Sequence, residues 1–252
     1  FYVPAQYIDM KDLALSREVD PNKFIIGLGQ DQMAIPFPSQ DTLTLGANAA
    51  HLILNENDKK DIDLVLFATE SGLDYSKALA LPLVKLLNLP HRVRALEIKE
   101  ACYAVTAALQ LANAHIALHP DKKVLVVTSD ISRYGINTPG EPTQGAGAIA
   151  MILSHNPSIL KLDTYSAYHA DDIQDFWRPN YSDIAFVDGK YSNEQYQHFF
   201  ETTFNQYLKE TQRNLNDFSA LLFHIPYTKI GLKALTSIAT KEDHPKLHEN
   251  YQ

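Results

Sequence analysis

Short apolar runs alternate with longer amphipathic stretches along the first 155 residues of the chain. The apolar runs at 62–68, 93–98, 123–128 and 148–153 are typical of strands covered on both faces of a sheet. Between them, the spacing of Leu, Met and Ala predicts helices over 9–18, 41–54, 76–89 and 102–119. Strands that alternate with helices in this way predict parallel pairing and a layered α/β fold.

A second α/β series begins near residue 156. The pattern predicts strands at 159–162 and 220–223, a long helix at 192–212 with Ser192 as its N-cap, and a helix at 228–240. The series ends in a polar tail without a further strand. We therefore expect one half over 1–155 and a second, incomplete half over 156–252, and Phe1 indicates a chain trimmed at its start.

Composition narrows the class of protein. The formal charge is 22 − 30 = −8, which disfavours a nucleic-acid surface. A single cysteine excludes an internal disulfide and suits a reducing compartment, so a cytoplasmic location is expected. No apolar run approaches the roughly 18 residues of a membrane helix, and there is no signal peptide, so no membrane partner is expected.

Three reactive side chains each stand just past the end of a predicted strand: Glu70, Cys102 and His224. Singly, each has a plain alternative: a solvated loop acid, a buried structural cysteine and a core histidine. Together they supply a nucleophile, a base and an acid at the sheet edge where α/β proteins bind ligands. Cys102 also opens a helix, whose dipole favours the reactive thiolate.

Six segments, three of which contain these residues, point to a known family. They are Ala68–Ser71, Glu100–Tyr103, Ser129–Tyr134, Asp175–Pro179, Val187–Lys190 and His224–Lys229. Their sequences and order resemble the bacterial type of 3-hydroxy-3-methylglutaryl-CoA (HMG-CoA) synthase. The resemblance implies a thiolase-like fold, with two similar halves layered α/β/α/β/α, and a homodimer.

The resemblance also implies a reaction. Cys102 would carry an acetyl group taken from acetyl-CoA, Glu70 would act as general base, and His224 would polarise the ketone of acetoacetyl-CoA. The product would be HMG-CoA, an intermediate of the mevalonate pathway to isoprenoids. CoA thioesters are then substrates, and neither a metal nor another cofactor is expected.

Because the protein is acidic overall, the cations that would bind the CoA phosphates must be gathered at one place on its surface. Lys229 and Lys233 lie four residues apart on one predicted helix face, which an ordinary solvated helix would also show; the resemblance assigns them to CoA. It assigns Tyr134, Thr143 and Ser192 to the same pocket, although Thr143 and Ser192 also suit a turn and a cap. Asp130 and Asp175 match positions around the pocket and are equally consistent with structural hydrogen-bond acceptors.

Two other functions remain open at this point. A ketoacyl-carrier-protein synthase III also uses a cysteine, but Glu70 and the Pro226–Lys229 run after His224 argue against it. A non-catalytic, CoA-binding fragment is the other alternative, because a distal Asn and a Gly/Ser loop of the family have no counterpart before Gln252. Acetylation of Cys102 would separate the enzyme from the binding fragment.

Overall fold

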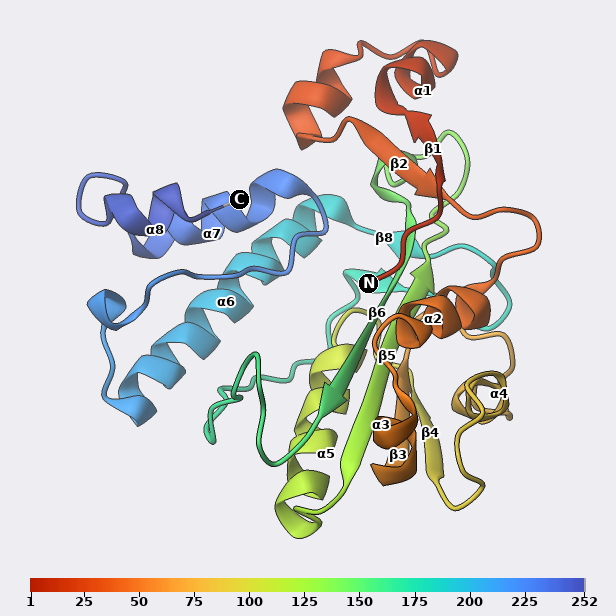
Figure 1. Cartoon of the computed structure of the whole chain (residues 1–252). Coiled ribbons are helices and arrows are strands. Elements are labelled where there is room, and N and C mark those ends of the chain that lie inside the picture. Colours follow the sequence, from red (N-terminus) through yellow and green to blue (C-terminus); the bar gives the residue numbers. More distant parts are fainter. Residues whose placement is uncertain (252) are drawn as a thin grey trace. The chain divides into compact units, whose positions relative to one another are not determined.

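A computed structural model describes residues 1–251, which fall into two compact units (Figure 1). Unit 1 consists of Phe1–Ile8, Met33–Ser132 and Gln144–Leu162; unit 2 consists of 9–32, 133–143 and the chain from residue 163 onward. Both are discontinuous in sequence. A two-stranded sheet of β1 (Gln6–Asp9) and β2 (Gln32–Ile35) forms where the chain leaves unit 1 and returns to it.

A four-stranded sheet is the centre of unit 1. Its strands are β3 (Ile62–Ala68), β4 (Arg94–Ile98), β5 (Lys123–Ile131) and β6 (Ala146–Leu153), in the order β4-β3-β5-β6. β3 pairs in parallel with both β4 and β5, as predicted. β6 pairs antiparallel with β5, contrary to that prediction, because a loop without a crossover helix joins the two strands.

Helices cover both faces of this sheet (Figure 1). On one face, α2 (Thr42–His51) and α4 (Ala80–Leu86) contribute Leu45 and Leu83 to a cluster with Phe67 and Val127. On the other face, α5 (Ala104–Leu118) packs its alanines against the strands. The short α3 (Glu56–Asp61) precedes β3. Unit 1 is thus a three-layer α/β/α structure.

The apolar character of α5 corrects one expectation. The segment Ala101–Leu118 is long and apolar enough to cross a membrane by length and composition alone. In the structure, Ala104, Ala108, Ala112 and Ile116 form a stripe of buried residues that faces the sheet. One stripe of the helix thus packs on the sheet, where small side chains permit a close approach.

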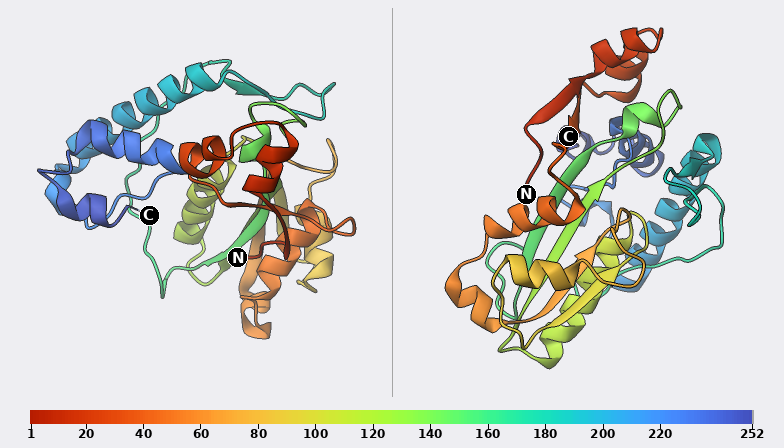
Figure 2. Two further views of the ribbon diagram at one scale, coloured as in Figure 1. Left: turned by 90° about the horizontal axis from the view of Figure 1, so that it is seen from above. Right: turned by 90° about the vertical axis from the view of Figure 1, so that its right-hand side faces the viewer.

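Unit 2 is mainly helical. Its elements are α1 (Met10–Ser16), a π-helix η1 (Lys23–Leu28), the 3₁₀ turns η2 (Glu141–Thr143) and η3 (Leu215–Asp217), the strands β7 (Phe176–Trp177) and β8 (Phe186–Val187), and the helices α6 (Gly189–Thr211), α7 (Thr228–Ile238) and α8 (Pro245–Glu249). α6 and α7 lie side by side (Figure 2). Leu235, Ala239 and Leu247 form a small core between α7 and α8.

Three local predictions for the second series are wrong. Residues 159–162 and 220–223 form no strand, and their apolar side chains are largely exposed, Ile159 at 90% and Leu222 at 94%. α6 begins at Gly189, and its N-cap is Asp188, whose Oδ1 accepts a hydrogen bond from Tyr191 N at 3.1 Å, so Ser192 lies inside the helix. An acceptor one turn earlier satisfies the helix start.

Candidate active site

β3 and β4 are neighbouring parallel strands, and the chain leaves both at the same edge of the sheet in unit 1. Glu70 comes just after β3, and Cys102 lies between β4 and α5. Asp130 is near the end of β5, the parallel neighbour of β3 on its other side. The carboxylates of Glu70 and Asp130 both act electrostatically on the Cys102 thiol. The structure therefore brings these three residues together.

One oxygen of Asp130 holds the backbone that follows β3. Asp130 Oδ1 accepts hydrogen bonds from Glu70 N at 2.8 Å and from Ser71 N at 3.1 Å. The hydroxyls of Thr69 and Ser71 donate to the same oxygen at 2.7 and 2.8 Å. Four donors from three consecutive residues thus converge on a side chain of the neighbouring strand. This arrangement fixes where Glu70 leaves the sheet.

Burial accompanies this network. Glu70 is only 9% exposed and Thr69 is fully buried. Burial raises the pKa of Asp130, and the hydrogen bonds from Thr69 and Ser71 act in the opposite direction. The loop is also tied to α2, because Thr42 Oγ1 donates to Ser71 O at 3.0 Å. A loop whose backbone is held by so many hydrogen bonds can keep Glu70 in a precise position during a reaction.

Glu97 on β4 holds the next part of the same loop. Its Oε2 accepts a hydrogen bond from Leu79 N at 2.6 Å, just before α4. Gly72 passes so close to this carboxylate that a Cβ added there would lie 2.6 Å from Oε1. A side chain of the strand that leads to Cys102 therefore binds the loop that starts at Glu70. No local pattern in the sequence indicates this contact.

Cys102 lies in a tight turn between strand and helix. Ala101 has φ +42°, a left-handed conformation that is uncommon for a residue with a Cβ. Tyr103 N donates to Glu100 O at 3.0 Å and closes the turn. Strained turns of this kind are concentrated at functional sites. The turn presents Cys102 as an exposed free thiol immediately before α5.

The protonation state of Cys102 differs from the expectation. The helix dipole predicts a stabilised thiolate, whereas the surroundings raise the pKa of the thiol to about 11. Loss of water around the sulfur is the largest cause, although the residue as a whole is exposed, and the charges of Glu70 and Asp130 add to it. A helix terminus contributes only about 0.3–1 kcal/mol at an exposed site. At neutral pH the thiol therefore keeps its proton.

His224 belongs to unit 2, in the extended segment before α7. Loss of water around the imidazole lowers the pKa of His224, which favours the neutral ring near neutral pH. Its carbonyl accepts a hydrogen bond from Tyr196 Oη of α6 at 2.7 Å. Loss of water around the Tyr196 hydroxyl, together with the nearby Tyr251 and Tyr227, raises the pKa of Tyr196 to about 12. This phenol therefore remains a hydrogen-bond donor.

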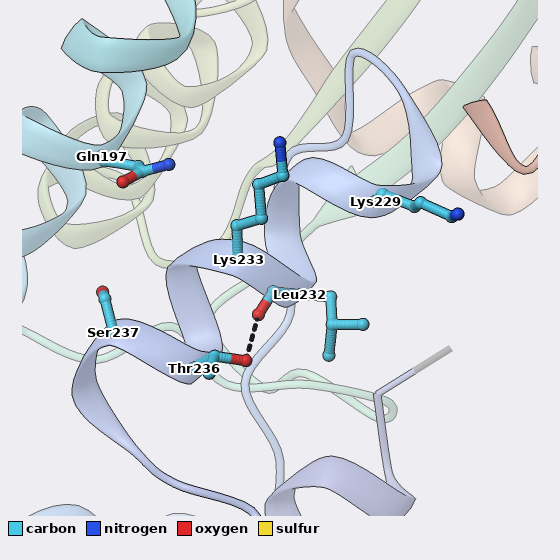
Figure 3. Close-up of a pocket in the computed structure, with 6 residues that line it drawn as sticks. All are labelled: Gln197, Lys229, Leu232, Lys233, Thr236 and Ser237. Atoms are coloured by element: carbon cyan, nitrogen blue, oxygen red, sulfur yellow. Dashed lines mark hydrogen bonds between the residues drawn. The ribbon is translucent and has the colours of Figure 1, made fainter. Parts of the chain in front are cut away.

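Lys229 and Lys233 line a common pocket in unit 2 (Figure 3). The pocket has a volume of about 520 Å³ and lies between α6 and α7, with Gln197, Leu232, Thr236 and Ser237 as its other lining residues. Both lysines are exposed. Two ammonium groups beside hydroxyl and amide donors form a surface that suits an anionic ligand such as a phosphate.

The other candidates predicted from the sequence also lie in unit 2, but they are not among the residues that line the pocket between α6 and α7. Tyr134 packs edge-to-face against Phe176, with ring centroids 5.9 Å apart, and Asp175 directly precedes that phenylalanine. Thr143 ends the turn η2, where its Oγ1 donates to Gly140 O at 2.8 Å. Ser192 lies in the first turn of α6. Their assignment to a ligand remains a prediction.

Among residues 1–251, no three His, Cys, Asp or Glu side chains are arranged to hold a metal ion. Sequence reasoning also missed the ion pair of Arg17 with Glu141 in unit 2. The one sequence signal that could have identified Glu141 as part of an ion pair is its position between Gly140 and Pro142. An acidic residue in a loop is otherwise common.

Comparisons with known proteins agree with this geometry. Residues 1–158 match the family described as hydroxymethylglutaryl-coenzyme A synthase N terminal, and residues 160–250 match its C terminal counterpart. The chain is 53% identical over 235 residues to the hydroxymethylglutaryl-CoA synthase of Enterococcus faecalis, which covers 93% of this chain and 61% of that protein. It thus spans about three fifths of the length of this relative.

Solved structures give the same result. An HMG-CoA synthase complexed with CoA has a TM-score of 0.96 at 43% identity, covering 99% of this chain and 65% of that one. A protein called MvaS, in complex with 3-hydroxy-3-methylglutaryl coenzyme A, has a TM-score of 0.87 at 37% identity, covering 94% and 60%. The fold is thiolase-like, as predicted, and the chain belongs to the hydroxymethylglutaryl-CoA synthase family.

Proposed function

We propose that this chain carries the acyl-transfer centre of an enzyme that condenses acetyl-CoA, acetoacetyl-CoA and water to HMG-CoA and CoA. The observation that supports this most is the placement of Glu70 and Cys102 at the carboxyl ends of adjacent parallel strands, close enough to interact electrostatically. The family match and the two relatives in complex with CoA and HMG-CoA support the same reaction. They also favour it over a ketoacyl-carrier-protein synthase.

The first step transfers the acetyl group. The sulfur of Cys102 attacks the thioester carbonyl of acetyl-CoA, and a new C–S bond replaces the bond to the CoA sulfur. Because the resting thiol is protonated, its proton leaves as the bond forms, and the departing CoA sulfur takes up one proton. Backbone N–H groups at the start of α5 serve as donors to the developing oxyanion.

The second step forms the carbon–carbon bond. Glu70 removes a proton from the methyl group of acetyl-Cys102, and the resulting enolate attacks the ketone of acetoacetyl-CoA. His224 stabilises the alkoxide that develops there by donating a proton or a hydrogen bond. Water then cleaves the thioester to Cys102 and releases HMG-CoA. Asp130 holds the backbone of Glu70 during these steps.

CoA is held by unit 2 in this proposal. Lys229 and Lys233 attract its phosphates, while Tyr134, Thr143 and Ser192 contact the pantetheine arm or the acyl end. Phe176 packs against Tyr134, and Asp175, directly before Phe176, is proposed as a supporting residue of the same region. No metal and no further cofactor are required, because the acid–base chemistry is supplied by side chains.

We also propose a homodimer in the cytoplasm. β4 is the outermost strand of its sheet, and Leu96 on it is 50% exposed, which suits pairing with a second copy. Light scattering after gel filtration should give twice the chain mass. A Leu96→Lys variant should give the monomer mass, and an unchanged mass would contradict pairing through β4.

The test of the reaction is acetyl loading. Incubation with acetyl-CoA should add one acetyl group to the chain by intact mass, and peptide mapping should place it on Cys102. Free CoA should appear in equal amount. A chain that binds CoA but takes up no acetyl group would instead be a CoA-binding fragment.

A further inference from the structure

A two-pronged ion pair in unit 2 joins segments far apart in the sequence. Arg17 Nε donates to Glu141 Oε2 at 2.8 Å, and Arg17 Nη2 donates to Glu141 Oε1 at 2.7 Å. The Glu141 side chain is 7% exposed and that of Arg17 is 27% exposed. Bidentate pairing of a guanidinium with a buried carboxylate is directional and stronger than a surface ion pair.

The carboxylate of Glu141 is also the centre of its own loop. Asn137 N donates to Glu141 Oε2 at 2.8 Å, and Glu141 N donates to Thr138 O at 3.1 Å. Asn137 has φ +57°, so this turn needs support. The loop then passes directly through η2 to Thr143. The Glu141 side chain thus closes the loop through its hydrogen bond with the Asn137 backbone.

Arg17 is positioned by the helix α1, at whose C-terminal end it lies. It follows α1, whose N-cap Asp9 accepts a hydrogen bond from Lys11 N at 2.8 Å. Arg17 Nη1 also donates to Ser16 Oγ at 3.3 Å, which orients the guanidinium. The hydrogen bonds from Arg17 lower the pKa of Glu141, so the carboxylate stays charged at neutral pH. The pair is therefore intact under ordinary conditions.

We propose that Arg17 is a positioning residue, whose bidentate ion pair with Glu141 holds the turn Glu141–Thr143 in the shape in which Thr143 contacts a CoA thioester. The inference rests on the proposed function, which assigns Thr143 to CoA. Arg17 touches no substrate in this role. Its effect is on the concentration of thioester that the chain requires, and the chemistry at Cys102 proceeds as before.

The experiment measures acetylation of Cys102 by intact mass at a series of acetyl-CoA concentrations, using the whole chain. Arg17→Met keeps an unbranched side chain similar to the aliphatic part of arginine and removes both hydrogen bonds to Glu141. We expect the half-saturating acetyl-CoA concentration to rise at least fivefold, with the maximal rate unchanged within twofold. Arg17→Lys keeps the charge but can form only one of the two hydrogen bonds. Its half-saturating acetyl-CoA concentration should lie between those of the unaltered chain and Arg17→Met. The swapped variant R17E/E141R should recover part of the loss relative to R17E.

The matched control is Arg213→Met. Arg213 forms an ion pair with Asp163 at 2.8 Å in the same unit, but both side chains are well exposed. This variant should leave the half-saturating concentration unchanged. Hydrogen exchange should show faster exchange at the Asn137 amide in Arg17→Met and not in the control, and this readout also serves if Arg17→Met lowers the melting temperature.

The outcomes are distinct. If the unaltered chain is acetylated and Arg17→Met needs the same acetyl-CoA concentration, the inference fails and the proposed function stands. If exchange at Asn137 does not change, Arg17 does not hold the loop and the inference also fails. If Thr143→Val alone leaves the concentration unchanged, Thr143 is not the contact and the inference fails. A chain that takes up no acetyl group overturns the proposed function, and the inference with it.

Discussion

The two units hold their candidate residues in contrasting ways. In unit 1, Glu70 is buried, and its backbone N–H is bound by a carboxylate of the neighbouring strand. In unit 2, His224, Lys229 and Lys233 are exposed, and no residue of α6 beside them is buried. The difference teaches that the proposed base and nucleophile are fixed by a sheet, whereas His224 and the lysines proposed to attract CoA lie on α7 or in the exposed segment before it. Substitutions in the two sets should therefore differ in size and in salt dependence.

The largest effect is expected at the nucleophile. Cys102→Ser should abolish acetyl uptake from acetyl-CoA, because a hydroxyl is a far weaker nucleophile than a thiol at neutral pH. The side chain is exposed and nearly isosteric, so the free energy of unfolding should change by no more than about 0.5 kcal/mol. Intact mass and a thermal melt measure the two quantities. Acetylation of the variant at the original rate would contradict the assignment.

The next effect separates the two chemical steps. Glu70→Gln keeps the size of the side chain and removes the base, so formation of HMG-CoA should fall by about 10²–10⁴-fold. Acetyl uptake on Cys102 needs no carbon acid and should fall much less. His224→Ala should weaken the use of acetoacetyl-CoA and spare acetyl uptake. Equal losses of both steps in Glu70→Gln would make Glu70 an organiser of the site.

The fold of unit 1 was predictable because its signals are local. The run from Ile62 to Ala68 is apolar throughout, and β3 has those bounds. The helix predicted over 76–89 is shorter, because α4 spans Ala80–Leu86, and Pro82 lies in its first turn, where proline is tolerated. The strand predicted at 220–223 does not form, because pairing requires a partner that a local pattern cannot reveal.

The candidate site shows the same limit. The order of Glu70, Cys102 and His224 after predicted strands could be read from the sequence. The pKa of Cys102 could not, because it depends first on the loss of water around the sulfur in the folded chain and then on carboxylates 32 residues before it and 28 residues after it. The four donors on Asp130 likewise depend on the parallel register of β3 and β5, in which Ala68 pairs with Thr128.

A third effect concerns pH. Alkylation of Cys102 by iodoacetamide should accelerate as pH rises towards about 11, the pKa of the thiol. A carboxylate disfavours the thiolate, so Glu70→Gln should lower this pKa and shift the alkylation profile to lower pH. Glu56→Gln changes an exposed acid in unit 1 and serves as the control. Superimposable profiles for Glu70→Gln and the unaltered chain would show that Glu70 does not act on the sulfur.

The smallest effect is expected at the surface cations. Exposed charge pairs contribute about 0.2–1 kcal/mol each, so Lys229→Ala with Lys233→Ala should weaken CoA binding by roughly 2- to 30-fold at low salt. Salt screens exposed charges over about 10 Å at 0.1 M and 3 Å at 1 M, so the difference should shrink as salt is added. The pair Lys241→Ala and Lys246→Ala, also exposed in unit 2 but outside the pocket, is the matched control. Titration calorimetry with CoA at two salt concentrations measures both variants. An equal loss in both would reflect net charge alone, and a salt-independent loss confined to the first pair would indicate direct, desolvated contacts in place of attraction at the surface.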